Sequence, residues 1–283
     1  MSELHPPITA VRAAVARALE EDLAPLGDMT ASLLPVDLQA SAVLVSRDDG
    51  VIAGRVCAVE TFAQVDASVI VEWRIDDGAE VAPGDVIARV EGPLPSILIA
   101  ERTALNFLRH LSGVASLTRR YVRATHGKAT VLDTRKTTPG LRSLEKAAVR
   151  AGGAANHRGS LSDGVLIKDN HLGGLSIADA VHRAKRRWPG RLVEVECETV
   201  AQVREAVEAG ATMVMLDNMT PGRVRSAVKE VAGRAMVEVS GRIDLESIGE
   251  YARIKGVDYV SVGALTHSSA ALDIGLDLEP DGA

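Results

Sequence analysis

The stretch RLVEVECETVAQVREAVEAGATMVMLDN, residues 191–218, decides the fold of this protein. It begins and ends with short apolar runs typical of buried strands, and a helical pattern that Thr199 introduces as an N-cap lies between them. A strand, a helix and a second strand in this order predict two parallel strands joined by a crossover helix.

The same pattern recurs along the second half of the chain. Apolar runs that end in a polar residue return roughly every 20 to 25 residues, as expected for strands that alternate with helices. They are ATVLDTR from 129, GVLIKDN from 164, RLVEVEC from 191, TMVMLDN from 212, AMVEVSG from 235 and VDYVSVG from 257. Helix starts are predicted at Ser176, Thr199, Thr220-Pro221 and Asp244. The fold class is therefore α/β, and the repetition favours a closed barrel over an open doubly wound sheet, which stays the alternative.

Strand alternation predicts which side chains share a face. Glu194 and Glu196 point to one side of their strand, whereas Val193, Val195 and Cys197 point to the other. We expect the aliphatic faces to meet the helices and the polar faces to point into the barrel. The polar residues at the carboxyl ends would then ring one mouth, where barrels build their active sites, namely Arg135, Lys168, Glu196, Asp217, Ser240 and Gly263.

The first part of the chain has a different texture. Residues 8–23 predict an amphipathic helix, short β-rich runs start near 40, 50 and 69, and residues 75–92 predict two extended segments around the Pro83-Gly84-Asp85 turn. Residues 96–123 predict a long helix.

Composition excludes several classes of protein. The chain has 283 residues with 46% hydrophobic residues and a net charge of −6, which argues against a general nucleic-acid or anionic-membrane surface. Cys57 and Cys197 are isolated, so neither a zinc site nor a disulfide framework is expected. An acidic, amphipathic start and the lack of a long apolar run predict a soluble cytoplasmic protein.

One polar stretch, residues 133–171, stands out in this acidic chain. It carries cations between two apolar strands, interleaved with glycines, and so predicts a local anion pocket. Arginines with a histidine suit carboxylates, while lysines and glycine-rich turns suit phosphates. Glu196 and Asp217 instead suit a divalent cation, ribose hydroxyls or a developing positive charge. A polyanionic substrate with Mg²⁺ accommodates both sets.

These motifs resemble a known family. In order and spacing, DTRKTTPGLR, NHRGSLSDGVLIKDNH, VEVEC, MLDN, VSG and SVGALTHS are similar to quinolinate phosphoribosyltransferase, and so are EDLAPLGDMT, GVIAG and AERTALNFLRHLSG near the start. The resemblance covers nearly the whole chain. It implies transfer of phosphoribosyl from phosphoribosyl pyrophosphate to quinolinate, with release of CO2 and pyrophosphate and with Mg²⁺ as cofactor, giving nicotinate mononucleotide for NAD synthesis.

The resemblance also implies an architecture and site roles. It implies an incomplete α/β barrel, residues 114–267, beside an amino-terminal α/β sandwich, residues 1–113, which the segment 268–283 would complete. It implies a homodimer with shared active sites, with higher oligomers open. Arg102 would reach in from the partner, and Arg135, His157 and Arg158 would take the quinolinate carboxylates. Lys136 and Lys168 would act near the transfer centre. Glu196 and Asp217 would act on the ribose and, mostly indirectly, on the metal. Ser240, Gly241 and Gly263 would bind the 5′-phosphate.

Other interpretations stay open. A Schiff-base barrel lyase could use Lys168, a relative of the same fold could act on another anionic acceptor, and residues 75–92 resemble a carrier hairpin that lacks its lysine. Glu194 and Glu238 are interpreted as ion-pair or network residues, while His171 and His267 are as compatible with structural roles as with site roles. Arg242, after VSG, departs from the family pattern: it either points outward or adds a cation beside the expected phosphate site.

Overall fold

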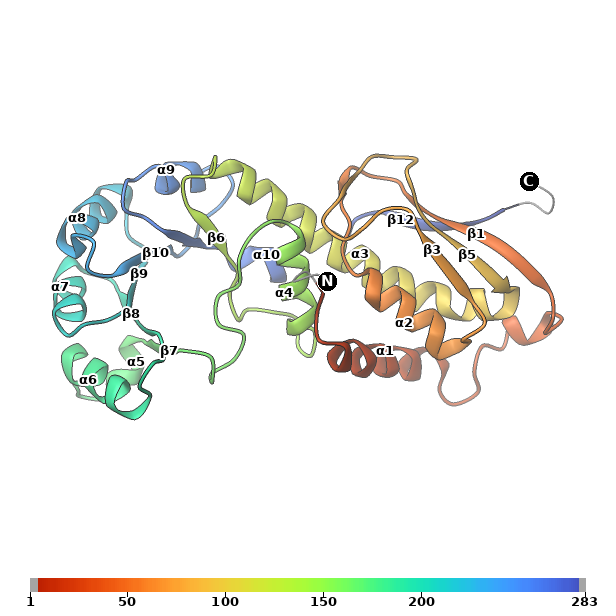
Figure 1. Cartoon of the computed structure of the whole chain (residues 1–283), viewed down its shortest axis with the longest axis horizontal. Coiled ribbons are helices and arrows are strands. Elements are labelled where there is room, and N and C mark those ends of the chain that lie inside the picture. The colour runs from red at the N-terminus through yellow and green to blue at the C-terminus, as the bar shows by residue number, and fades with distance from the viewer. Residues whose placement is uncertain (1–4, 280–283) are drawn as a thin grey trace. The chain divides into compact units, whose positions relative to one another are not determined.

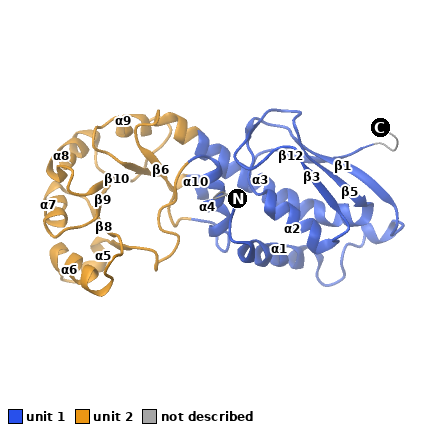
Figure 2. Ribbon diagram, in the orientation of Figure 1, with its two compact units in different colours: residues 1–119, 137–153, 265–283 blue, residues 120–136, 154–264 orange. Residues whose placement is uncertain are grey.

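The computed structural model describes residues 5–279 of the chain, which forms two compact units. Unit 1 comprises residues 1–119, 137–153 and 265–283, and unit 2 comprises residues 120–136 and 154–264 (Figure 2). The outermost residues of the expected sandwich domain, 1–4 and 280–283, lie outside the described part. Helix α4 (Arg142–Ala151) groups with unit 1, although the sequence places it between two barrel strands.

Unit 1 is an antiparallel sheet packed against helices. Its strand order is β12 (Ile274–Leu278), β1 (Gln39–Ser46), β5 (Val86–Pro93) and β3 (Ile70–Trp73). Its helices include α1 (Ile8–Leu23), α2 (Arg55–Val65) and most of α3 (Leu94–Ala124) (Figure 1). The sheet and helices share a core that includes Leu44, Phe62, Ile87 and Leu108. The carboxyl-terminal strand β12 pairs with β1 at one edge of this sheet.

The amino-terminal predictions hold with small changes. The helix expected over 8–23 is α1, and the long helix is α3. The two extended segments around Pro83-Gly84-Asp85 are β4 (Glu80–Val81) and β5, but they do not pair with each other: β4 pairs with β2 (Gly50–Val51), and β5 pairs with β1 and β3. A short 3₁₀ helix, Ala31–Leu33, lies between α1 and β1.

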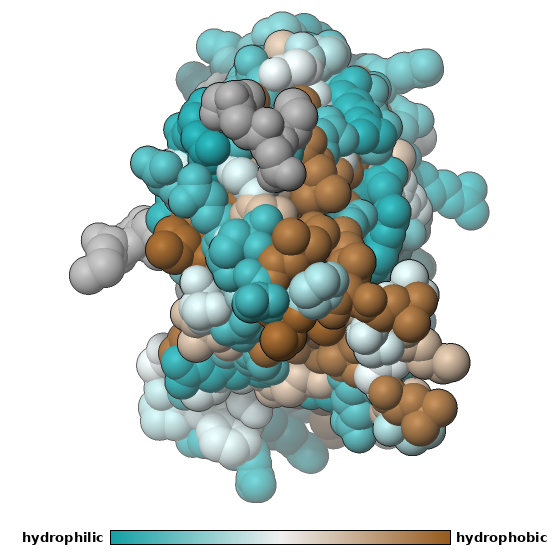
Figure 3. Space-filling view, turned by 90° about the vertical axis from the view of Figure 1, so that its right-hand side faces the viewer, coloured by the Kyte–Doolittle hydropathy of each residue, from teal (hydrophilic) through white to brown (hydrophobic). Residues whose placement is uncertain are grey.

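Unit 1 exposes several large apolar side chains. Figure 3 shows brown hydrophobic surface gathered on the face of unit 1 that is turned to the viewer. The exposed apolar residues of the segment between α1 and β1 are Leu26, Met29, Leu33, Val36 and Leu38. Clusters of exposed large apolar side chains are typical of surfaces that another molecule covers.

Unit 2 is a parallel sheet with helices packed on it. The strand order is β6 (Thr130–Leu132), β11 (Tyr259–Ser261), β10 (Met236–Ser240), β9 (Met213–Asp217), β8 (Val193–Cys197) and β7 (Val165–Ile167). The crossover helices are α6 (Ile177–Arg187), α7 (Val200–Glu208), α8 (Pro221–Val231) and α9 (Ile248–Ala252) (Figure 1). Because β6 and β7 are the two ends of the order, the barrel is incomplete. The closed barrel favoured by the repeat count is thus wrong, and the incomplete α/β barrel is confirmed.

The helix starts of unit 2 follow from local sequence. The side chains of Ser176, Thr199 and Thr220 each accept a backbone N–H of the first turn, as predicted for N-caps. Asp244 behaves differently: its carboxylate accepts the N–H groups of Glu246 and Ser247, and the α-helix begins only at Ile248. Among the described residues, no helix combines the length and the apolarity that a bilayer crossing requires.

Candidate active site

Polar side chains of unit 2 collect at the carboxyl ends of the parallel strands. The register pairs Asp217 of β9 with Ser240 of β10, and Glu196 of β8 with Met215 of β9, so these residues lie on one face, as alternation predicts. Lys168, which follows β7, forms an ion pair with Glu196. The Asp217 carboxylate accepts the side-chain amide of Asn218 at 2.6 Å. Lys168 and Glu196, both predicted for the mouth, are thus in contact, and Asp217 lies on the same face of the neighbouring strand.

Asp133 anchors the loop that brings His157 and Arg158 over the sheet. It follows β6, is fully buried, and accepts the Asn156 side-chain amide at 2.7 Å and the His157 backbone N–H at 2.8 Å. The Arg158 guanidinium donates to the carbonyl oxygen of Gly164 at 3.1 Å. Two hydrogen bonds to one buried carboxylate therefore fix the backbone at the start of this loop.

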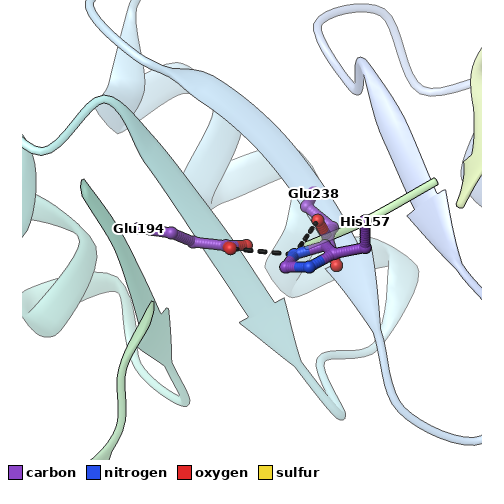
Figure 4. Close-up of side chains that lie close together, drawn as sticks. All are labelled: His157, Glu194 and Glu238. Carbon is purple, nitrogen blue, oxygen red and sulfur yellow. Dashed lines mark hydrogen bonds and ion pairs between the residues drawn. The ribbon is translucent and has the colours of Figure 1, made fainter. Parts of the chain in front are cut away.

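His157 lies against two buried glutamates. Its Nε2 is 2.9 Å from Glu194 of β8 and 3.4 Å from Glu238 of β10, and the two glutamates are 1% and 0% exposed (Figure 4). Its Nδ1 accepts the backbone N–H of Arg158 at 2.8 Å. Both ring nitrogens of His157 thus make contacts within the protein.

The contacts of this trio determine where its protons lie. Burial by itself lowers the pKa of His157, but hydrogen bonds to Glu194 and Glu238 outweigh it and raise the pKa to about 10. Burial and the charge of Glu238 also raise the pKa of Glu194. A pKa of about 10 by itself would leave the ring doubly protonated near neutral pH, but such a ring could not accept the Arg158 N–H at Nδ1. The form that satisfies the contacts of the ring has a hydrogen on Nε2 and a lone pair on Nδ1.

The trio also has the composition of a metal site, since the ligand atoms of His157, Glu194 and Glu238 lie within 4.8 Å of one another. A metal on Nε2 would move the ring hydrogen to Nδ1, where the Arg158 N–H already donates. We therefore interpret the trio as a hydrogen-bond network.

The cations of the pocket lie close to one another. Burial lowers the pKa of Arg158, the positive charge of Arg135 lowers it further, and the negative charge of Glu194 acts in the opposite direction. Arg135 is half-buried, whereas Lys136 is exposed. Two guanidinium groups near enough to repel each other predict an anionic ligand between or beside them.

The loops after β9 and β10 touch at Gly241. Gly241 has φ +95°, and a Cβ there would lie 2.8 Å from the backbone nitrogen of Asn218, which donates to Ser240 at 3.0 Å. Asn218 and Arg242 also adopt positive φ, at 53° and 52°. Position 241 requires glycine, because its backbone is left-handed and a side chain there would clash with Asn218. The loop at the expected phosphate site therefore has a defined conformation.

Replacing Gly241 by Ala should destabilise the protein by about 2 kcal/mol, because the methyl group would overpack the Asn218 loop in a left-handed conformation. The matched control is Gly222→Ala on α8, where a Cβ meets no atom within 4 Å. Urea unfolding measures both free energies. Equal stabilities of the two variants would contradict this account of the loop.

The remaining predicted residues are placed as follows. Gly263, half-buried, follows β11. Arg102 belongs to α3 in unit 1, its side chain is 70% exposed, and it forms an ion pair with Glu101 at 3.3 Å. His171 and His267 are exposed at the ends of short helices.

Asp133 and Asn156, which carry the loop, had no role in the sequence interpretation. Glu194 and Glu238 were interpreted as ion-pair or network residues, and they contact the ring of His157. Strand parity did place Glu194 and Glu238 on the inward face. Periodicity could not show that His157, a loop residue about 40 residues from Glu194, would contact both glutamates.

Comparisons with known proteins agree with this geometry. Residues 114–277 match the sequence model of the C-terminal domain of quinolinate phosphoribosyl transferase, and residues 28–112 match that of its N-terminal domain. A quinolinate phosphoribosyltransferase (decarboxylating) of Nicotiana tabacum is 41% identical over 287 residues, covering 93% of this chain and 81% of the relative. A probable nicotinate-nucleotide pyrophosphorylase (carboxylating) of Bacillus subtilis is 43% identical, covering 89% of this chain and 88% of the relative.

Solved structures show the same relationship. The nicotinate-nucleotide pyrophosphorylase of Francisella tularensis superimposes with a TM-score of 0.92 at 39% identity, over 97% of this chain and 98% of that one. Human nicotinic acid phosphoribosyltransferase shares only the fold, with a TM-score of 0.63 at 14% identity.

Proposed function

The chain belongs to the quinolinate phosphoribosyltransferase family, and we propose that it transfers phosphoribosyl from phosphoribosyl pyrophosphate to quinolinate, releasing CO2 and pyrophosphate and giving nicotinate mononucleotide. The observation that carries the proposal is the arrangement of unit 2. Arg135 and Arg158 form a cationic group, and Glu196 and Asp217 form an anionic group at the adjacent strand ends. A dicarboxylate acceptor needs the first group, and a ribose that gains positive charge needs the second.

In this proposal the arginines orient the acceptor. The guanidinium groups of Arg135 and Arg158 meet the two carboxylates of quinolinate, with His157 beside them, and the partner's copy of Arg102 closes the pocket. Holding both carboxylates directs the pyridine nitrogen at the reacting carbon of the ribose. Lys136 and Lys168 contact carboxylate or phosphate oxygens near that carbon.

Glu196 and Asp217 act on the ribose. Departure of pyrophosphate leaves positive charge on the ribose carbon, and nearby carboxylates stabilise that charge. Ser240, Gly241 and Gly263 hold the 5′-phosphate, and Arg242 adds a cation beside it. The nitrogen, once alkylated, is a cation that stabilises the carbanion formed when the neighbouring carboxylate leaves as CO2, and this carbanion then takes up a proton to give nicotinate mononucleotide. No covalent enzyme intermediate is needed.

Mg²⁺ is part of the proposal. The carboxylates of Glu196 and Asp217 lie at adjacent strand ends and have the oxygen donors that Mg²⁺ prefers, so the residues fit the ion. Mg²⁺ bound with the substrate would neutralise the departing pyrophosphate. Glu196 also holds Lys168, so the protein's contribution to the ion is mostly indirect.

We also propose a cytoplasmic homodimer with shared active sites, in which higher association stays possible. The exposed apolar side chains of unit 1, such as Leu26, Leu33 and Val36, support a covered surface.

Two other functions are less well supported. A Schiff-base lyase requires an uncharged lysine, whereas Lys168 forms an ion pair with Glu196. A relative that acts on a pyridine acid with a single carboxylate needs fewer cations to bind it than Arg135, Arg158 and Lys168 supply. Comparing quinolinate with nicotinate as acceptors, by release of pyrophosphate, tests the proposal: only quinolinate should react, and preference for nicotinate would contradict it.

A further inference from the structure

The proposed mechanism assigns no role to two buried acidic side chains. Glu194 and Glu238 are 1% and 0% exposed on the inner face of the barrel. Within the described residues, Oε1 of neither side chain has a hydrogen-bond partner. Burying two such groups costs free energy, so their place beside the acceptor pocket calls for a function.

We propose that Glu194 and Glu238 are positioning residues of the acceptor pocket, which hold Nε2–H of His157 so that Nδ1 fixes the backbone of Arg158. The inference rests on the proposed function, because it assumes that the Arg158 guanidinium meets an acceptor carboxylate.

A continuous series of contacts supports this role. The carboxylates lie 2.9 and 3.4 Å from Nε2 of His157, and Nδ1 accepts the Arg158 N–H at 2.8 Å. From the other side, Asp133 holds the His157 N–H at 2.8 Å. The backbone on both sides of the His157 Cα is thus fixed, once by Asp133 and once by the imidazole. Figure 4 shows the two glutamates beside this ring.

The orientation of the His157 ring matters as much as its contacts with the glutamates. If Nε2–H lost its acceptors, the ring would turn toward other partners and Nδ1 would release the Arg158 N–H. One N–H of the Arg158 guanidinium donates to the Gly164 carbonyl oxygen. The position of its remaining donors depends on the position of the Arg158 backbone. Small displacements of such a group reduce affinity strongly.

The test compares two double variants. Glu194→Gln/Glu238→Gln keeps oxygen acceptors for Nε2–H without the charge, whereas Glu194→Leu/Glu238→Leu removes both. The glutamine variant should keep KM for quinolinate within about threefold, and the leucine variant should raise it by about tenfold or more. KM for phosphoribosyl pyrophosphate should stay within about twofold in both.

Wild-type KM for quinolinate in the leucine variant overturns the proposal, and so does an equal rise of both KM values, which a merely structural role would produce. If the double leucine variant does not fold, Glu194→Leu against Glu194→Gln carries the same comparison, since Glu194 makes the shorter contact.

A second readout does not depend on turnover. The imidazole ¹⁵N signals of His157, assigned by their loss in His157→Asn, report which nitrogen carries the hydrogen. We expect Nε2–H in the wild type and the glutamine variant, and its loss in the leucine variant. A hydrogen on Nδ1 alone in the wild type overturns the proposal. If the proposed function is wrong, the wild type does not turn over quinolinate while this signal stays readable, so the two failures are distinguishable.

Discussion

Replacing Glu196 by Gln is expected to lower kcat by about 10²- to 10³-fold at saturating concentrations of both substrates. The substitution keeps the size of the side chain and removes the negative charge that the mechanism places beside the ribose carbon. It also removes the ion pair with Lys168, which then has no charged partner at the end of β8. Steady-state release of pyrophosphate measures the effect.

Glu198→Gln is the matched control for this prediction. Glu198 follows the same strand, two residues further on, and its side chain is exposed. Its replacement by Gln should leave kcat unchanged. If Glu196→Gln kept kcat within about threefold of the wild type, Glu196 would not stabilise the charge of the transition state.

Replacing Arg135 by Ala should weaken the binding of quinolinate by about 10- to 100-fold, because a charged hydrogen-bonding partner of a carboxylate is lost. Arg135→Lys should recover part of the loss, since it keeps the charge but not the forked geometry. Equilibrium dialysis with labelled quinolinate measures the affinity directly.

The control for Arg135 is Arg183→Ala, which removes an exposed arginine of α6 on the same unit. It changes the net charge equally and should leave quinolinate binding unchanged. If the two alanine variants bound quinolinate equally well, the arginine would contribute only to the general charge of the protein.

Periodicity and strand parity predicted most of unit 2. The six apolar runs are the six strands, and parity placed Glu196, Asp217 and Ser240 on one face because side-chain alternation is a local property of the backbone. Closure of the sheet was predicted wrongly from the number of repeats, since whether β6 and β7 pair depends on contacts between distant segments.

The network around His157 could not be predicted for the same reason. Asp133, His157, Glu194 and Glu238 come from β6, a loop, β8 and β10, and only the folded loop brings them together. The helix start expected at Asp244 failed for a local reason: its carboxylate closes a turn with Ser247 before the α-helix begins.

The central claim is that this protein couples phosphoribosyl transfer to decarboxylation. The most direct measurement is release of labelled CO2 from carboxyl-labelled quinolinate, with and without phosphoribosyl pyrophosphate and Mg²⁺. We predict one CO2 for each pyrophosphate formed, and release only when both additions are present. No release under any condition, or release without phosphoribosyl pyrophosphate, would contradict the account.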